Sequence, residues 1–334
     1  MPDTIEAATL IERLSALLGP RGLLTDPADT AAYVEDWRRL YRGRTPAVAR
    51  PASTEETASV LRLCAEAGAP VVPQGGNTSM VGGATPSEDG REIVLSLARL
   101  NRVRAIDPAD LSLTVEAGVT LRAAQVAADE AGCLLPLSIS SEGTAQIGGI
   151  LATNAGGNNT LRYGNARDLV LGLEVVTAEG AVWNGLRRLR KDNTGYCLRQ
   201  LFVGSEGTLG VITAAVLKLV PRPRETAVAL CALPSPEAAL DLLARFQAHD
   251  PGAVQAFEYM SGTGVDFVLK HIPGASLPLS APAAQYALVE LATPRADGSL
   301  RERRDNPDRR SAAWTVSRHR DDESEPGPRR HERR

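Results

Sequence analysis

Histidine is scarce in this sequence of 334 residues. Only four histidines occur, and none of them forms a closely spaced pair: His249, His271, His319 and His331. The four cysteines are equally scattered and form no C-x-x-C pair: Cys64, Cys133, Cys197 and Cys231. Neither a zinc site nor a dithiol motif is therefore indicated, and no metal site is predicted. We expect the cysteines to be reduced and buried.

Long apolar runs and an excess of basic residues are also missing. No apolar stretch approaches the roughly 18 residues that a membrane span needs, and the N-terminus lacks a basic region followed by an apolar one. Hydrophobic residues make up 43% of the chain, charged residues 23%, and the net charge is −3. This is the composition of an ordinary soluble protein, with no electrostatic reason to bind nucleic acid. The length allows two domains, and a cytoplasmic location is the default expectation.

What the sequence does contain is a glycine-rich stretch from Pro73 to Gly83, which reads PQGGNTSMVGG and follows a short apolar run. Glycine lets the backbone approach a ligand closely, while successive N–H groups and Asn, Ser and Thr side chains can donate to an anion. The stretch therefore favours a loop that closes around phosphate groups. It matches neither G-x-x-x-x-G-K-[ST] nor G-x-G-x-x-G, and taken alone it is also typical of a surface turn.

Three later segments repeat the combination of glycine with small polar residues beside an apolar strand. They are SEGTAQIGG at 141–149, TNAGG at 153–157 and GSEGTLG at 204–210. Glycine beyond what turns require favours a long ligand that lies against the backbone at several points. The first of the three is equally typical of a turn that leads into a helix. The last lacks the G-x-S-x-G spacing of a nucleophile elbow.

The order and spacing of the four blocks resemble the FAD-binding half of the flavin-linked oxidases related to vanillyl-alcohol oxidase, which carry a PCMH-type FAD-binding domain. Within that group the sequence is most similar to the D-2-hydroxy-acid dehydrogenases, which include D-2-hydroxyglutarate dehydrogenase, D-lactate dehydrogenase and the glycolate oxidase flavoprotein subunit. The likeness runs from about Thr45 to Pro221 and continues more weakly to about Pro294. It implies an α+β fold, in which a two-subdomain PCMH-type FAD-binding domain precedes an incomplete ferredoxin-like α+β substrate domain.

The resemblance also implies which residues contact FAD. It places Gly75 to Ser79 and Gly82 around the pyrophosphate, and the later blocks along the ribityl chain and flavin ring. The residues expected to bind the cofactor are Gln74, Gly75, Gly76, Asn77, Thr78, Ser79, Gly82, Pro136, Ser138, Gly143, Thr144, Gly148, Gly149, Thr153, Asn154, Gly156, Gly157, Glu206, Gly207, Gly210 and Ile212. Because no His or Cys stands in the first glycine loop, where relatives with covalent flavin often attach it, noncovalent FAD is expected. The segment 191–196 is expected to shield the flavin, although a plain surface loop fits its sequence nearly as well.

Apolar periodicity and capping residues predict the elements that connect these blocks. Helices are predicted at 5–18, from Ser53 in a capping box with Glu56, and from Thr120 to Ala131. Strands are predicted at 71–72, 93–97, 111–115, 169–176 and 211–220. Beyond the prolines at 221 and 223, a β-α-β-α-β order is predicted at 226–232, 235–249, 254–259, 262–270 and 285–291.

Four parts of the chain are predicted: an N-terminal helical segment at 1–44, the FAD-binding domain at 45–222, the incomplete substrate domain at 223–300 and a charged tail at 301–334. The tail has eleven arginines, eight acidic residues, no lysine and hardly any apolar residues. It cannot bury enough apolar surface to offset the entropy of ordering it, so disorder is expected. Our hypothesis is a frameshift or early stop near Leu300, which the other two reading frames of the downstream DNA would test. A natural charged tail is the alternative.

The resemblance implies an FAD-dependent oxidoreductase that oxidises a D-2-hydroxy acid of the D-2-hydroxyglutarate, D-lactate or glycolate class by hydride transfer to flavin. The electrons would pass on to a quinone, a cytochrome or an electron-transfer flavoprotein. In these dehydrogenases the base and the metal ligands come from a late His-rich, Glu-bearing segment. This chain contains no such segment, so the catalytic residues stay unassigned. The alternatives are a noncatalytic flavin-binding fragment or subunit, and another enzyme on the same fold, such as an enolpyruvyl-sugar reductase.

Overall fold

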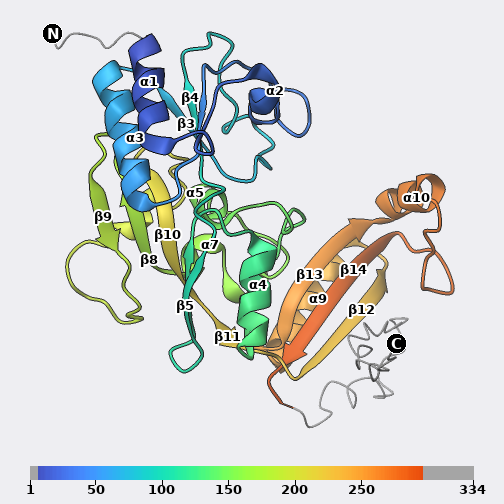
Figure 1. Cartoon of the computed structure of the whole chain (residues 1–334). Coiled ribbons are helices and arrows are strands. Elements are labelled where there is room, and N and C mark those ends of the chain that lie inside the picture. The colour runs from blue at the N-terminus through green and yellow to red at the C-terminus, as the bar shows by residue number, and fades with distance from the viewer. Residues whose placement is uncertain (1–6, 296–334) are drawn as a thin grey trace, which may run out of the picture. The chain divides into compact units, whose positions relative to one another are not determined.

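A computed structural model describes residues 7–295 of the chain (Figure 1). The contacts between residues divide the chain into two units, which are Met1–Arg222 and Pro223–Arg334. The predicted charged tail at 301–334 and the proposed frameshift near Leu300 lie outside the described residues.

The first sheet of the first unit has the strand order β1-β2-β4-β3. Strands β2, β4 and β3 are parallel, and β1 pairs antiparallel with β2. The bounds are Leu23–Leu24 for β1, Val48–Ala49 for β2, Val71–Gln74 for β3 and Ile93–Ser96 for β4. Helices α1 (Ala7–Leu18) and α3 (Thr54–Ala67) contact each other beside this sheet, and the short helices α2 (Pro27–Thr30) and η1 (Ala31–Tyr33) follow β1 (Figure 1).

Helix α3 begins after a capping serine and ends at a glycine. The Ser53 hydroxyl accepts a hydrogen bond from the N–H of Glu56 at 3.1 Å, which satisfies one of the free donors of the first turn. Gly68 ends the helix in the left-handed conformation with φ 63°. The Glu56 carboxylate accepts from the N–H of Ala52 at 2.7 Å, so the predicted capping box closes one residue earlier than expected.

The second sheet is antiparallel, with the strand order β5-β6-β10-β8-β9. The bounds are Val103–Asp107 for β5, Ser112–Glu116 for β6, Val170–Val176 for β8, Val182–Gly185 for β9 and Val211–Lys218 for β10. Every residue of β8 is buried, which explains why apolar residues and glycine fill the strand at every position except Glu174. Helices α4 (Leu121–Glu130) and α5 (Ile147–Ala152) contribute buried side chains to the core of this sheet. The short elements of this unit are α6 (Thr160–Tyr163), α7 (Ala166–Leu169), α8 (Arg199–Phe202), β7 (Cys133–Leu134) and its antiparallel partner β11 (Val220–Pro221).

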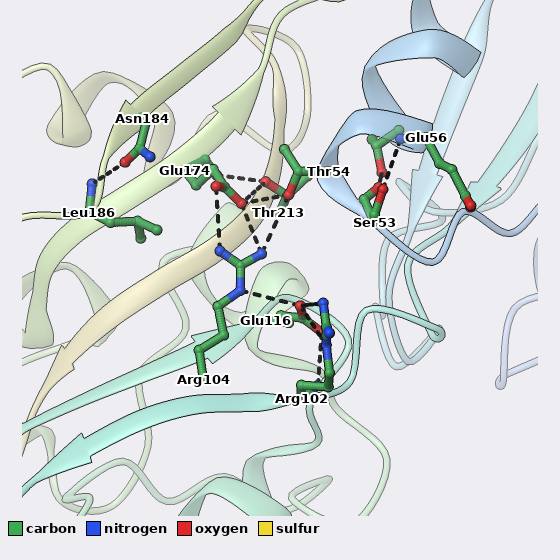
Figure 2. A network of polar contacts seen from close by, with 11 residues as sticks. Ser53, Thr54, Glu56, Arg102, Arg104, Glu116, Glu174, Asn184, Leu186 and Thr213 are labelled. Carbon is green, nitrogen blue, oxygen red and sulfur yellow. Dashed lines mark hydrogen bonds and ion pairs between the residues drawn. The ribbon is translucent and has the colours of Figure 1, made fainter.

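A buried ionic network ties the start of α3 to the second sheet (Figure 2). Arg104 on β5 lies between two carboxylates: its Nη2 is 3.1 Å from Glu174 Oε1 and its Nε is 3.2 Å from Glu116 Oε1. The Glu116 side chain is 0% exposed, and that of Glu174 is 10% exposed. The hydroxyls of Thr54 and Thr213 both donate to Glu174 Oε1, at 2.6 and 2.9 Å. The network therefore joins α3 with β5, β6, β8 and β10.

The second unit is an antiparallel three-stranded sheet with the order β12-β14-β13. The chain runs through β12 (Glu225–Leu233), α9 (Pro236–His249), β13 (Val254–Ser261), α10 (Gly262–His271) and β14 (Gln285–Thr293). Strands β12 and β13 are parallel to each other, with β14 inserted between them in the opposite direction, which makes a split β-α-β arrangement. Apolar residues of all three strands and α9 form the core of this unit.

The structure confirms the predicted α+β class and the β-α-β-α-β order of the second unit, with small shifts at the ends of elements. It corrects two expectations. The strand predicted at 211–220 is two strands, because β10 ends at Lys218 and β11 pairs with β7. Cys64, Cys133 and Cys231 are buried, but Cys197 is exposed, because it lies in the surface loop before α8 rather than in a core.

Candidate functional site

The glycine-rich stretch begins where β3 ends, and polar side chains fix its position. The buried Gln74 donates from Nε2 to the carbonyl oxygens of Tyr33 at 2.9 Å and Ala84 at 2.7 Å, so it closes the base of the loop. Asn77 has a left-handed backbone with φ 51° and donates from Nδ2 to the carbonyl oxygen of Glu35 at 2.9 Å. The loop is therefore anchored on the segment that follows η1.

The tip of this loop presents a run of free backbone donors. Among the residues that the structure describes, none accepts a hydrogen bond from the N–H groups of residues 76–79. Successive free N–H groups beside a left-handed residue form a concave binding site for an anion. Gly76 packs directly on the 141–149 segment, since a Cβ atom at this position would lie 2.0 Å from the carbonyl oxygen of Thr144. Two of the four glycine blocks thus meet backbone to backbone.

The second wall of the site is the helix α5 with its first residues. The N–H of Ile147 donates to the carbonyl oxygen of Val119 at 2.9 Å, and that of Gly148 to Ala117 at 2.8 Å. A Cβ atom on Gly148 would lie 2.7 Å from the Cβ of Ala117, whereas one on Gly149 would meet nothing within 4 Å. Packing therefore requires glycine at 148, while Gly149 faces open space.

The third wall is the 204–210 segment, which is hydrogen-bonded to the end of α5. The N–H of Glu206 donates to the carbonyl oxygen of Ala152 at 3.0 Å, and Glu206 has a left-handed backbone with φ 51°. A Cβ atom on Gly83 would lie 3.5 Å from Glu206 Oε2, so this segment faces the far end of the first glycine loop. Three of the glycine blocks thus surround one space.

The space is a cavity of about 230 Å³. The predicted residues that line it are Gln74, Gly75, Gly76, Asn77, Thr78, Ser79, Gly148, Gly149, Thr153, Glu206, Gly207, Gly210 and Ile212. Among residues 7–295, Glu206 is the one charged residue of the lining. No lysine or arginine of this described part lines the cavity, so within it an anion would be held by neutral donors.

The remaining predicted residues do not line the cavity: Gly82, Pro136, Ser138, Gly143, Thr144, Asn154, Gly156 and Gly157. Several of them have evident structural roles. A Cβ atom on Gly157 would lie 1.6 Å from the carbonyl oxygen of Ser138, and one on Gly82 would lie 2.7 Å from the ring of Tyr41. Asn154 Oδ1 accepts from the N–H of Arg167 at 2.9 Å. Cofactor contacts at these residues stay predictions.

Sequence reasoning missed a further set of lining residues: Pro73, Gly83, Ala84, Leu97, Ile139, Ser141, Ala145, Gln146, Ile150, Ala152, Ala155 and Val211. Most of them lie inside or beside the glycine blocks, and the resemblance did not single them out within those blocks. The most informative is Gln146, whose Oε1 is buried without a hydrogen-bond partner. A buried amide oxygen without a partner is costly, so this atom suits a ligand that donates a hydrogen bond.

Residues able to act as acids, bases or metal ligands are sparse around the cavity. Within residues 7–295, no group of three or more His, Cys, Asp and Glu side chains is placed to hold a metal ion. His249 and His271 both end helices of the second unit, α9 and α10. The segment 191–196, which was expected to shield the flavin, contributes instead to a second cavity that contains none of the glycine blocks.

Family profiles match both units of the chain. The profile described as FAD binding domain matches residues 45–185. The profile described as FAD linked oxidases, C-terminal domain, matches residues 222–326. The chain belongs to the FAD-linked oxidases. The free N–H groups of residues 76–79 and the unpartnered amide of Gln146 fit FAD, which carries a pyrophosphate and ring N–H donors.

Named relatives of this FAD-linked oxidase are dehydrogenases. It is 43% identical over 273 residues to a mitochondrial D-2-hydroxyglutarate dehydrogenase of Bos taurus, which covers 82% of this chain and 49% of that protein. A D-2-hydroxyglutarate dehydrogenase of Xanthomonas citri is 40% identical over 270 residues, with coverage of 81% and 56%. A D-2-hydroxyglutarate–pyruvate transhydrogenase of Saccharomyces cerevisiae is 35% identical over 264 residues, with coverage of 79% and 53%. The chain thus spans about half the length of the curated relatives it matches.

Solved structures share the fold of this FAD-linked oxidase. An alkyldihydroxyacetonephosphate synthase superposes with a TM-score of 0.79 at 19% identity, over 92% of this chain and 62% of that one. A p-cresol methylhydroxylase superposes with a TM-score of 0.70 at 18% identity, over 89% of this chain and 62% of that one. At such identities the likeness establishes the fold alone, which is the predicted PCMH-type flavin fold.

No helix within the described residues 7–295 combines the length and the apolar composition that crossing a membrane requires. The name of the bovine relative includes a mitochondrial location, so the predicted cytoplasmic location of this FAD-linked oxidase is not confirmed.

Proposed function

We propose that this chain is the flavin-binding part of an FAD-dependent enzyme that oxidises a D-2-hydroxy acid, of the D-2-hydroxyglutarate, D-lactate or glycolate class. The single observation that carries the proposal is the cavity lined by residues of all four glycine blocks, with its free N–H groups at residues 76–79. The names of the relatives, which are D-2-hydroxyglutarate dehydrogenases and a transhydrogenase, support the substrate class. The chain spans about half of those relatives, so oxidation of the hydroxy acid by this chain is a proposal.

Different residues of the cavity would bind different parts of FAD. The N–H groups of residues 76–79 would bind the pyrophosphate, and the Gln146 amide would accept a hydrogen bond from the cofactor. Apolar side chains such as Leu97, Ile150 and Val211 would exclude water from it. The flavin ring, when bound, supplies the acceptor for a hydride. No histidine or cysteine lines the cavity, which supports noncovalent binding.

Oxidation of a hydroxy acid also needs a base for the hydroxyl proton and a cation for the carboxylate. Around the flavin-binding cavity the one charged lining residue is Glu206, and no cation lines it. The alternative is therefore a noncatalytic flavin-binding fragment or subunit that lacks these groups. The electron acceptor is proposed to be a quinone, a cytochrome or an electron-transfer flavoprotein, and a cytoplasmic location stays a prediction.

Anaerobic titration of the purified chain distinguishes an enzyme that oxidises a D-2-hydroxy acid from a noncatalytic flavin-binding fragment. The flavin spectrum is recorded first, and D-2-hydroxyglutarate or D-lactate is then added, with the L-enantiomers as controls. Loss of the flavin absorbance at about 450 nm with a D-substrate alone supports the enzyme. A flavin-bound sample that no substrate bleaches supports the noncatalytic alternative. A chain that binds no flavin contradicts both.

The Gly149→Ala variant tests the cavity as the flavin site. A methyl group at 149 meets no protein atom within 4 Å, and alanine favours the helix α5, so we expect unchanged or slightly higher thermal stability. The same methyl group would occupy space beside the cofactor, and we expect flavin affinity to fall by about tenfold or more. Fluorescence titration of the apoprotein with FAD measures this.

The matched control for this variant is Gly252→Ala. Its Cβ atom would make one ordinary contact, 3.7 Å from Asp250 Oδ1, and Gly252 does not line the cavity. We expect its flavin affinity to equal that of the wild type. Equal loss of affinity in both variants, or in neither, would place the flavin elsewhere.

A further inference from the structure

A second cavity, of about 300 Å³, lies in the first unit and shares no lining residue with the flavin-binding cavity. Its lining residues come from β8, β9, the loop after β9 and the first residue of α8. The loop leaves the edge of the second sheet after β9 (Figure 1). Its apolar wall contains Leu171, Leu198 and Trp183, whose ring stacks on Phe202 with centroids 5.5 Å apart.

The charged group of interest in this cavity is Arg199. Its Nε is buried and has no hydrogen-bond partner. Among the described residues, its guanidinium forms none of the hydrogen bonds to acceptors and none of the ion pairs that other arginines of this region form. Leaving a buried guanidinium donor without an acceptor is costly, because its water is lost and nothing replaces it. Within residues 7–295, no acceptor therefore serves the buried Nε of Arg199.

The one acidic residue in the cavity wall is already engaged. Asp192 Oδ2 lies 3.1 Å from Arg187 Nη1, and Asp192 Oδ1 accepts from the N–H of Thr194 at 3.2 Å. The hydrogen bond from Thr194, together with that from Arg187, holds the pKa of Asp192 below its usual range. Asp192 is thus ionised at neutral pH and serves to fix the loop, so it leaves Arg199 without a counter-charge.

The electrostatic surroundings reinforce this excess of positive charge. Lys218 on β10 donates from Nζ to the carbonyl oxygen of Asp168. Burial lowers its pKa, and the positive charge of Arg190 lowers it further, whereas Asp168 raises it and Arg199 lowers it. Lys218 therefore senses the charge of Arg199, and an anion bound beside Arg199 would offset that repulsion.

We propose that this cavity binds a small organic carboxylate, with Arg199 as its anchor and Arg187 as a second donor. A guanidinium recognises a carboxylate through two parallel hydrogen bonds, which is the geometry that an unpartnered arginine offers. A single water molecule needs about 10–15 Å³ of cavity volume. The cavity of about 300 Å³ therefore has room for an organic group as well as a charge. Trp183 and Leu171 supply an apolar surface for that body, which a bare inorganic ion would leave uncovered.

Succinate is the probe for this site, and inorganic phosphate is the competitor of different chemistry. Calorimetric titration at fixed ionic strength compares the wild type with Arg199→Gln, and with Arg188→Gln as the matched control. Arg188 lies in the same loop and pairs with Asp107 at 3.0 Å, but it does not line the cavity. We expect succinate affinity to fall about tenfold or more in Arg199→Gln and to be unchanged in Arg188→Gln.

A second measurement needs no variant, because Cys197 lines the cavity and is the exposed cysteine among Cys64, Cys133, Cys197 and Cys231. We expect succinate to slow the alkylation of Cys197 by iodoacetamide severalfold, while sodium chloride at the same ionic strength has no effect. Mass spectrometry of the labelled peptide assigns the rate to this residue.

Three results would overturn the proposal. They are no saturable binding of succinate to the wild type, equal affinity of the wild type and Arg199→Gln for it, and an alkylation rate at Cys197 that succinate does not change. Tighter binding of phosphate than of succinate would make the site one for inorganic oxyanions and reject the carboxylate.

Discussion

Replacement of Arg104 by methionine is expected to lower the free energy of unfolding of the first unit by about 3–5 kcal/mol. Methionine keeps much of the side-chain volume but removes the positive charge between Glu116 and Glu174. Glu116 is fully buried in its side chain, so the variant leaves a buried carboxylate pair with one bridging cation fewer. Urea unfolding followed by tryptophan fluorescence measures the loss.

Arg102→Met is the matched control for this prediction. Arg102 also bonds Glu116, with Nη2 2.9 Å from Oε1, but its side chain is 70% exposed and it does not touch Glu174. Its loss leaves Arg104 in place, and solvent screens the exposed guanidinium of Arg102, so we expect a clearly smaller destabilisation. An equal loss of unfolding free energy in the two variants would show that the bridge of Arg104 between Glu116 and Glu174 contributes no more to stability than the exposed pair of Arg102 with Glu116. Arg104→Lys should recover only part of the stability, because an ammonium cannot present a planar fork to both acids.

The same network predicts how stability depends on pH. Burial raises the pKa of Glu116, but the hydrogen bonds from Arg102 and Arg104 outweigh it and leave the pKa below its usual range. A carboxyl group with a lowered pKa in the folded state stabilises the protein above its unfolded pKa, and the contribution is lost as pH falls through the folded value. The difference between wild type and Arg104→Met should therefore shrink as the pH drops below about 4.5. A difference that stays constant in acid would contradict an ionic origin.

Replacement of Gly76 by alanine is expected to remove flavin from the purified chain. The new Cβ atom would lie 2.0 Å from the carbonyl oxygen of Thr144 and 2.8 Å from its carbonyl carbon, and backbone cannot move aside as a flexible side chain can. The glycine loop must shift, and the N–H groups of residues 76–79 move with it. Overpacking of this kind costs up to about 3 kcal/mol, which corresponds to about 100-fold in affinity. Absorbance of the purified variant and titration with FAD measure the effect.

Gly75→Ala is the control for this variant. Its Cβ atom would make ordinary contacts, the nearest at 3.6 Å, although Gly75 lines the same cavity one residue away. We expect a much smaller loss of affinity than for Gly76→Ala. Retention of normal flavin content by Gly76→Ala would mean that the position of this loop does not govern binding of the cofactor.

Most helices and strands were predictable from local signals in the sequence. Ser53, Thr120 and Ser235 each accept a hydrogen bond from a first-turn N–H of the helix that they were predicted to begin. Strands with both faces buried, such as β8, were recognisable because nearly all of their residues are apolar. Strand β5 was not predicted, because its first three residues are exposed and it is held by pairing with β6 and by ion pairs to residues far away in sequence.

The candidate site was predictable in its blocks but not residue by residue. Gly76 and Gly149 line the cavity, whereas Gly157 is required by the carbonyl oxygen of Ser138, and the sequence shows the same letter in each case. A close approach between two segments of the chain and a close approach to a ligand both demand glycine. Gln146 could not be singled out either, because its importance rests on the missing partner of its side-chain oxygen.

The order of strands in the second unit has a consequence for synthesis of the chain. Strand β14 is the last of the three to be translated, and it is the central one, paired with both β12 and β13. On the ribosome, the first two strands emerge without a neighbour to bond to, and the sheet forms only after residue 293 has left the exit tunnel. The strands of the first unit are all translated by Pro221, so that unit has a head start in folding.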